Sequence, residues 1–136
     1  MFFNKKSNDA NSDLVKVAAL LIHAAKIDEN YTDHEEKIIK KTLLELGAKI
    51  ENLENLVTNA KKIEDNANQI LDFTKEIKNM HQENKIKIIE SLWQIIYSNK
   101  EADIYETGLM RRLAGLLYID NKTMGDIKDK IKKANT

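Results

Sequence analysis

The chain of 136 residues contains no proline and only four glycines, and its apolar residues recur at intervals of three and four. Proteins built from strands need frequent turn residues, whereas a spacing of three to four residues places apolar side chains on one face of an α-helix. The pattern therefore predicts an all-α protein. Because one hydrophobic core commonly spans about 100 to 200 residues, we expect a single compact bundle.

The apolar positions predict about seven helices. A nearly continuous apolar stretch over residues 14–27 predicts a central helix that others surround, capped by Ser12 or Asp13. Further helices are predicted after Thr32, over about 51–62, 68–80 and 84–97, after Asp103 and after Asp120. Residues 1–12 are mostly polar, so we interpret them as a flexible leader; 13–133 then form the domain and 134–136 a tail.

Two polar turns in the sequence follow the same plan. Thr32 and Glu35 match a capping box, in which each side chain accepts a hydrogen bond from the other residue's amide, and Gly47 is suited to end the helix that follows. Asp103 and Glu106 repeat the signal 71 residues later. Each turn follows a predicted buried helix and precedes an amphipathic one. We therefore predict an internal pseudo-repeat whose two turns lie at corresponding ends of the bundle.

The same turns are candidates for a cation site, because carboxylate oxygens are the ligands that Ca²⁺ and Mg²⁺ prefer. Neither turn is an EF-hand, since both lack the glycine and the final glutamate of that loop. The simpler interpretation is that the acids cap helices and favour the positive pole of the helix dipole. A divalent site would require the fold to bring the turns together, with ligands from Asp28, Asp33, Glu35, Glu101, Asp103 and Glu106.

Arg111 and Arg112 are the only arginines of the chain. A guanidinium can hold a carboxylate through two parallel hydrogen bonds, so we expect one of them to pair with an acidic turn; binding of a partner is the alternative. The sequence has no cysteine, no glycine-rich phosphate loop and no nucleophile motif, and His34-Glu35 lacks the second histidine of a zinc hydrolase. We therefore expect no enzymatic activity.

Charge and hydropathy limit the classes of partner. The 22 Lys and Arg residues balance 22 Asp and Glu residues and are interspersed with them. Nucleic-acid binders present a basic face, so we expect no nucleic acid as partner. The longest apolar stretch is shorter than the roughly 20 residues that a membrane span needs, and the start has no secretion signal. The sequence thus predicts a cytoplasmic protein without a membrane span.

The stretch Ala24–Glu35, with Asp28 and Glu35 at its acidic positions, resembles the acidic turn of TerB-like (tellurite resistance protein B) domains. Segments at 71–74, 89–95 and 103–117 are similar to the C-terminal half of the bacterial TerB-like subgroup, so the resemblance covers about residues 13 to 133. It implies about seven helices, an association with tellurite and other stress responses, and kinship with the N-terminal domain of DjlA-type co-chaperones. It also implies metal chelation by the acidic turns, without enzymatic activity.

The chain departs from the TerB-like pattern where the metal would bind. Glu29 stands in place of the glycine of the first turn, and Asn99-Lys100 replace Asp-Gly in the second. The leading hypothesis is a non-catalytic, stress-associated protein that holds a divalent ion at these turns. The alternative is a protein-interaction module, like an accessory domain of a co-chaperone, that works through an exposed apolar helix face without an ion. On either reading we expect a protein partner.

Overall fold

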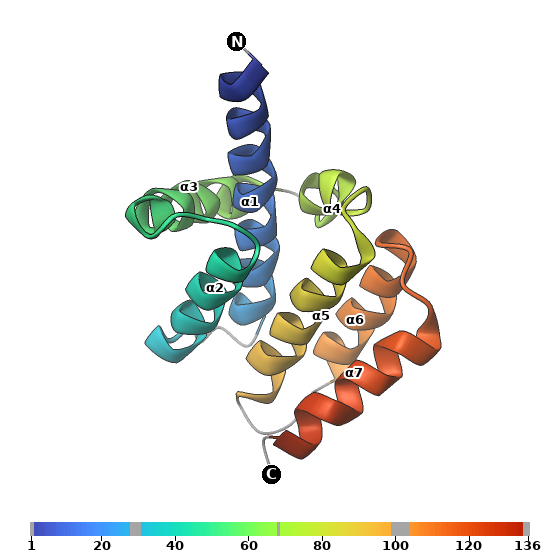
Figure 1. Ribbon diagram of the computed structural model, residues 1–136. Coiled ribbons are helices and arrows are strands. Elements are labelled where there is room, and N and C mark those ends of the chain that lie inside the picture. Colours follow the sequence, from blue (N-terminus) through green and yellow to red (C-terminus); the bar gives the residue numbers. More distant parts are fainter. Residues whose placement is uncertain (1, 28–30, 68, 99–103, 135–136) are drawn as a thin grey trace.

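The computed structural model describes residues 2–27, 31–67, 69–98 and 104–134, with side-chain surroundings from residue 12 onward except at 104–106. This part of the chain contains seven α-helices, one short 3-10 helix and no strand (Figure 1), which confirms the predicted all-α class. The elements are α1 (Phe2–Lys26), α2 (Asp33–Glu45), η1 (Ile50–Asn52), α3 (Leu53–Asn66), α4 (Leu71–Ile77), α5 (Gln82–Tyr97), α6 (Ile104–Leu116) and α7 (Asn121–Ala134).

Helix α1 forms the centre of the core, as its apolar stretch predicted. It packs against α2, α3, α4 and α5, and most of its side chains from Val17 to Ala25 are buried. The helix begins at Phe2, however, so the prediction that Ser12 or Asp13 caps its start is wrong. No proline or glycine precedes residue 26 to stop the helix, which continues through both predicted caps. The division into leader, domain and tail stays a prediction.

Helix α5 is the second buried helix. Ile88, Ile89 and Leu92 are fully enclosed, Trp93 is almost so, and α1 and α7 pack against this helix. In Figure 1, α1 and α5 run in broadly the same direction and end on the same side of the molecule. This placement agrees with the predicted plan, in which each of two buried helices leads into an amphipathic helix. The two turns that complete the proposed repeat lie largely outside the described residues.

The ends of helix α2 follow the sequence signals. At its start, the Glu35 amide donates to Thr32 Oγ1 at 3.2 Å and the Thr32 amide donates to Glu35 Oε1 at 2.8 Å, so the capping box is confirmed. At its end, Gly47 has a φ of +108°, and the amides of Gly47 and Ala48 donate to the carbonyls of Leu44 and Leu43. This hydrogen-bond pattern is a Schellman motif, which favours glycine at its left-handed position.

The end of α6 has the same Schellman pattern with a different residue at its left-handed position. The amides of Tyr118 and Ile119 donate to the carbonyls of Gly115 and Ala114, and Tyr118 has a φ of +58°. Left-handed backbone is uncommon for residues other than glycine, because Cβ then approaches the following carbonyl oxygen. Nothing in the apolar spacing indicates this conformation.

A buried lysine joins the ends of two helices. Lys85 is only 6% exposed, and its Nζ donates to the carbonyl of Leu117 at 2.9 Å and to that of Lys78 at 3.2 Å. These carbonyls belong to residues directly after α6 and α4, where unpaired carbonyls carry partial negative charge. The ammonium group of Lys85 therefore caps both helices at once.

Candidate functional site

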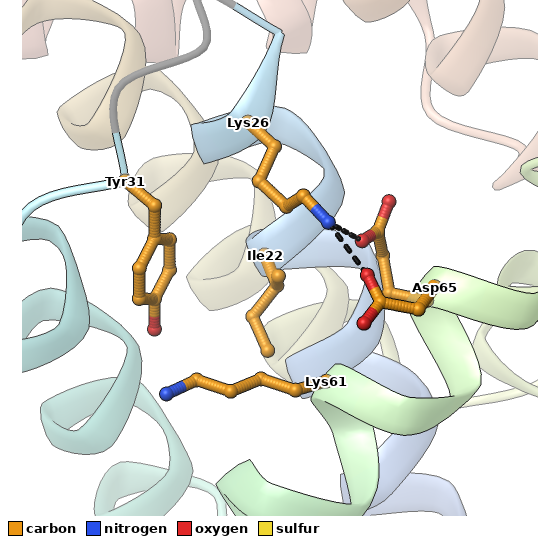
Figure 2. A pocket seen from close by; sticks show the side chains of 6 residues that line it. Ile22, Lys26, Tyr31, Lys61 and Asp65 are labelled. Atoms are coloured by element: carbon orange, nitrogen blue, oxygen red, sulfur yellow. Dashed lines mark hydrogen bonds and ion pairs between the residues drawn. The ribbon is translucent and has the colours of Figure 1, made fainter.

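A cleft of about 480 Å³ lies where α1, α3 and the segment before α2 meet. Figure 2 shows Tyr31 on one side of this cleft and Asp65 on the other, with Ile22 between them. The lining residues are Ile22, Lys26, Tyr31, Lys61, Glu64 and Asp65. The cleft thus combines an apolar floor with charged groups on its walls, a composition typical of small-molecule sites of roughly 300 to 1,000 Å³.

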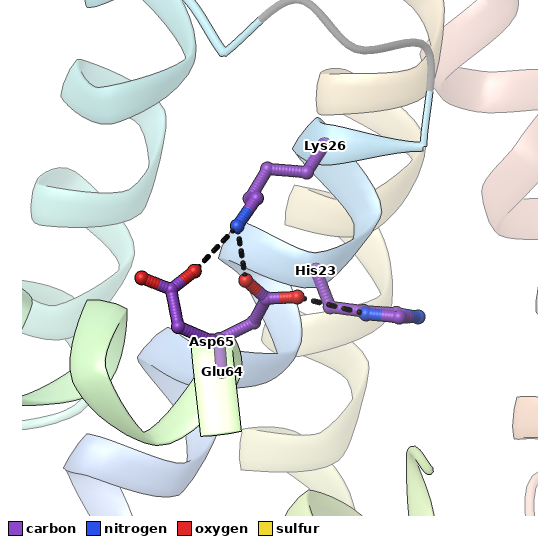
Figure 3. A network of polar contacts seen from close by, with 4 residues as sticks. All are labelled: His23, Lys26, Glu64 and Asp65. Atoms are coloured by element: carbon purple, nitrogen blue, oxygen red, sulfur yellow. Dashed lines mark hydrogen bonds and ion pairs between the residues drawn. The ribbon is translucent and has the colours of Figure 1, made fainter. Parts of the chain in front are cut away.

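One wall of the cleft carries a cluster of three charged residues, and a histidine outside the lining joins this cluster (Figure 3). Lys26 Nζ donates to Glu64 Oε1 at 2.6 Å and to Asp65 Oδ1 at 2.8 Å, while His23 Nδ1 lies 3.2 Å from Glu64 Oε2. The hydrogen bonds to Asp65 and Glu64 raise the pKa of Lys26 above its usual value. The amine is therefore protonated at neutral pH, and a protonated amine is not a nucleophile.

On the opposite wall, Tyr31 and Lys61 both contact Glu36, which does not itself line the cleft. The Tyr31 hydroxyl donates to Glu36 Oε1 at 3.2 Å, and Lys61 Nζ lies 3.1 Å from the same oxygen. Lys61 Nζ also lies 5.4 Å from the centre of the Tyr31 ring, within the range of a cation–π contact. This wall therefore holds one carboxylate between a phenol and an ammonium group.

The protonation states on this wall follow from burial and charge. Burial raises the pKa of Tyr31 far above its usual value, and the carboxylates of Glu36, Glu35 and Asp33 raise it further. Burial also acts to raise the pKa of Glu36, but Lys61 and Lys40 outweigh this effect and hold it below its usual value. At neutral pH the phenol is therefore neutral and the carboxylate ionised.

Lys26 and Tyr31 do not fit acid–base or nucleophilic chemistry in this cleft at neutral pH. Each ionisable side chain that lines the cleft has a hydrogen-bond or ion-pair partner: Lys26 contacts Glu64 and Asp65, and both Lys61 and Tyr31 contact Glu36. A catalytic lysine or tyrosine requires a pKa lowered toward neutrality. The pKa values of Lys26 and Tyr31 are instead raised, away from neutrality.

The predicted metal ligands are described only in part. Asp33 is the first residue of α2 and is exposed, whereas Glu35 is 1% exposed and its Oε1 accepts hydrogen bonds from the amide and hydroxyl of Thr32. Asp28, Glu101 and Asp103 lie outside the described residues, and Glu106 lies in α6 with its side chain outside the description. Among the side chains that are described, no three His, Asp or Glu residues form a group able to hold a metal ion. Capping is confirmed for Glu35, and the six-ligand site stays a prediction.

Arg111 and Arg112 both lie on the exposed face of α6. Arg111 lines a small cleft of about 170 Å³ together with Trp93 and Lys128. Neither arginine forms an ion pair with any carboxylate in the described ranges, so the predicted pairing is not observed there.

Sequence reasoning missed the α1–α3 cleft. Its ion pairs join Lys26 to acids 38 and 39 residues further along the chain. The only sequence signal is that Lys26 lies near the end of one predicted helix and that Glu64 and Asp65 are adjacent acids just after another. That signal identifies neither residue as the partner of the other.

Comparison with known proteins gives one family match. The family model described as tellurite resistance protein TerB matches residues 14–129, a range that contains the whole α1–α3 cleft. No curated protein and no solved structure matches the chain. Within the described ranges, no helix is both long enough and apolar enough to cross a membrane.

Proposed function

Since the chain belongs to the TerB family of tellurite resistance proteins, we propose that it is a non-catalytic, stress-associated binding protein whose ligand site is the α1–α3 cleft. The observation that supports binding over catalysis is the pairing of each ionisable group that lines the cleft, with the pKa values of Lys26 and Tyr31 raised. Such groups hold a ligand by hydrogen bonds and charge without exchanging protons with it.

The ligand chemistry follows from the lining. Ile22 and the ring of Tyr31 offer apolar contact, while the ion pairs of Lys26 and Lys61 lie at the surface, where water weakens them. A small amphipathic molecule can therefore replace part of these pairs with its own polar group and place its apolar part on Ile22. The cleft carries no large excess of charge, so the ligand need not be strongly ionic.

Binding at this cleft is tested with a library of small amphipathic compounds. Compounds that raise the melting temperature are expected to shift the amide NMR signals of Ile22, Tyr31 and Lys61. Lys61→Met should weaken their binding, whereas Lys62→Met, which changes the next residue of α3 and lies outside the cleft, should not. Bound compounds should be recovered unchanged by mass spectrometry. Chemical conversion, or binding that Lys61→Met leaves intact, would contradict the proposal.

A divalent cation at the acidic turn is a second candidate, supported by a separate observation. The first turn of α2 carries three acids, Asp33, Glu35 and Glu36, which favour a negative potential at this end of the helix. Such a potential attracts Ca²⁺ or Mg²⁺, for which Asp28, Asp33 and Glu35 would be ligands, joined by Glu101, Asp103 and Glu106 if the second turn approaches.

Isothermal titration with Ca²⁺, Mg²⁺ and Zn²⁺ tests the cation. A binding heat that Asp33→Asn reduces, and that Asp72→Asn on α4 leaves unchanged, is the expected result. Absence of heat and of any melting shift at millimolar metal removes the cation and leaves the cleft proposal intact.

A further inference from the structure

A second groove, of about 430 Å³, lies between α4 and the end of α6, which are adjacent in Figure 1. Leu71, Leu116 and Tyr118 give it apolar walls, and Lys75 and Lys78 are its charged lining residues. Thr74 and Gly115 complete the lining, which contains no acidic residue. We refer to these seven residues as the α4–α6 groove.

The α4–α6 groove gathers exposed apolar side chains. Leu71 is 42% exposed and Tyr118 is 68% exposed, and they are two of only four large apolar residues that are exposed in the described ranges. The other two, Leu44 and Ile50, do not line this groove. Exposed apolar side chains that gather in one groove can contribute to a docking site.

The backbone supports a role for the Tyr118 side chain at this place. Its left-handed φ of +58° occupies a position that glycine would fill without steric conflict, as Gly47 does at the end of α2. Lys85 Nζ lies 5.9 Å from the centre of the Tyr118 ring, so the ring rests near the ammonium group that caps α4 and α6. Tyrosine therefore brings an anchored but exposed ring to the groove despite an unfavourable backbone.

The charged side chains that line the groove have one sign. Lys75 and Lys78 lie in its lining, and Arg112 is exposed on α6 one helical turn before Leu116, without an ion pair among the described residues. The acids of α4, Asp72 and Glu76, line a neighbouring cleft that shares Leu71 and Lys75 with the groove, but they do not line the groove itself. A partner that fits this surface carries apolar side chains flanked by carboxylates.

We propose that the α4–α6 groove docks an acidic, amphipathic peptide segment of a partner protein. An apolar side chain of the segment packs between Leu71 and Tyr118, and its carboxylates pair with Lys75, Lys78 and Arg112. Tyrosine and arginine are among the residue types that most often dominate the binding energy of such interfaces. The inference does not depend on the α1–α3 cleft, which involves other helices.

Selection of short random peptides displayed on phage, with the full chain as bait, tests the groove. The enriched peptides are expected to combine Asp or Glu with large apolar residues. Fluorescently labelled copies should bind Tyr118→Gly about tenfold more weakly than the unchanged chain, as for loss of a dominant interface residue. Because glycine suits the left-handed position, this variant keeps the end of α6, and circular dichroism should confirm its fold.

Two matched controls locate the effect. Ile50→Ser removes a more exposed apolar side chain outside the groove and should leave peptide affinity unchanged. Substitution of both Lys75 and Lys78 by Glu should weaken the binding of the acidic peptides. The same substitution of Lys37 and Lys41, which are exposed on α2, should have little effect on that binding. Compound binding in the α1–α3 cleft should survive Tyr118→Gly, which separates the two proposals.

Several outcomes would overturn the docking of an acidic segment. Selection without enrichment, peptides that lack acids, or affinity that Tyr118→Gly leaves unchanged each contradict it. A concentration-dependent dimer that Tyr118→Gly abolishes would assign the groove to a second copy of the chain. Binding to phosphatidylglycerol vesicles that exceeds binding to the peptides would assign it to a lipid surface.

Discussion

Lys26 and Lys85 each donate to two oxygen atoms, but they do so in opposite surroundings. Lys26, in the α1–α3 cleft, faces the carboxylates of Glu64 and Asp65, and its side chain is 42% exposed. Lys85, beside the α4–α6 groove, is 6% exposed and faces two backbone carbonyls. Water can replace the partners of Lys26, whereas the buried acceptors of Lys85 have no such substitute.

The difference suits the two regions to different tasks. The surface ion pairs of the cleft can rearrange around a ligand at small cost in free energy. The ends of α4 and α6 are instead fixed to each other by one enclosed ammonium group, which gives the α4–α6 groove a rigid wall. A rigid surface loses little conformational freedom when a peptide docks on it.

Replacement of the two lysines should show the largest contrast. Lys85→Met keeps the length of the side chain but leaves the carbonyls of Lys78 and Leu117 without their charged donor, so we expect a loss of about 3 kcal/mol in unfolding free energy. Lys26→Met removes surface ion pairs and should change it by less than about 1 kcal/mol. Urea denaturation of both variants measures the difference. Equal losses of unfolding free energy in the two variants would contradict the claim that burial makes Lys85 more important for stability than Lys26.

The role of Lys85 could be predicted from the sequence, whereas that of Lys26 could not. Lys85 precedes Ile88, Ile89 and Leu92 by three, four and seven residues, so it lies on the buried face of α5 and needs acceptors there. The partners of Lys26 depend on how α1 packs against α3, which no local pattern specifies. The capping box of α2 and the burial of α1 were predicted because they depend on spacing within one segment.

The Schellman motif of α2 provides the second contrast, with an intermediate effect. Gly47→Ala places a Cβ on a residue with a φ of +108°, and we expect it to lower the unfolding free energy by about 1 to 2 kcal/mol. Gly125→Ala lies inside α7 with no atom within 4 Å of the new Cβ, so it should raise stability by up to about 1 kcal/mol. Thermal unfolding of both variants should therefore shift in opposite directions.

Alkaline pH tests how enclosed the cleft is on the Tyr31 side. Burial, and then the charge of Glu36, raise the pKa of Tyr31 in the folded chain above the unfolded value of about 10. The contribution of Tyr31 to the free energy of unfolding is therefore complete below pH 10. Above pH 10 it declines, by at most about 0.8 kcal/mol at pH 10.5. Tyr31→Phe should remove that part of the decline in urea titrations, and Glu36→Gln should reduce it. Identical slopes in all three proteins would contradict the raised pKa.

The smallest effect is expected from Tyr118→Gly, and its sign is the informative part. Glycine relieves the left-handed conformation but adds freedom to the unfolded chain, so we expect a net gain of about 0.5 kcal/mol. Tyr118→Ala keeps the steric conflict and loses the ring beside Lys85, so it should bring no gain. If glycine stabilises the fold while it weakens peptide docking, Tyr118 serves binding at the expense of stability. If glycine instead destabilises the fold, the ring has a structural role, and the contrast with Gly47 disappears.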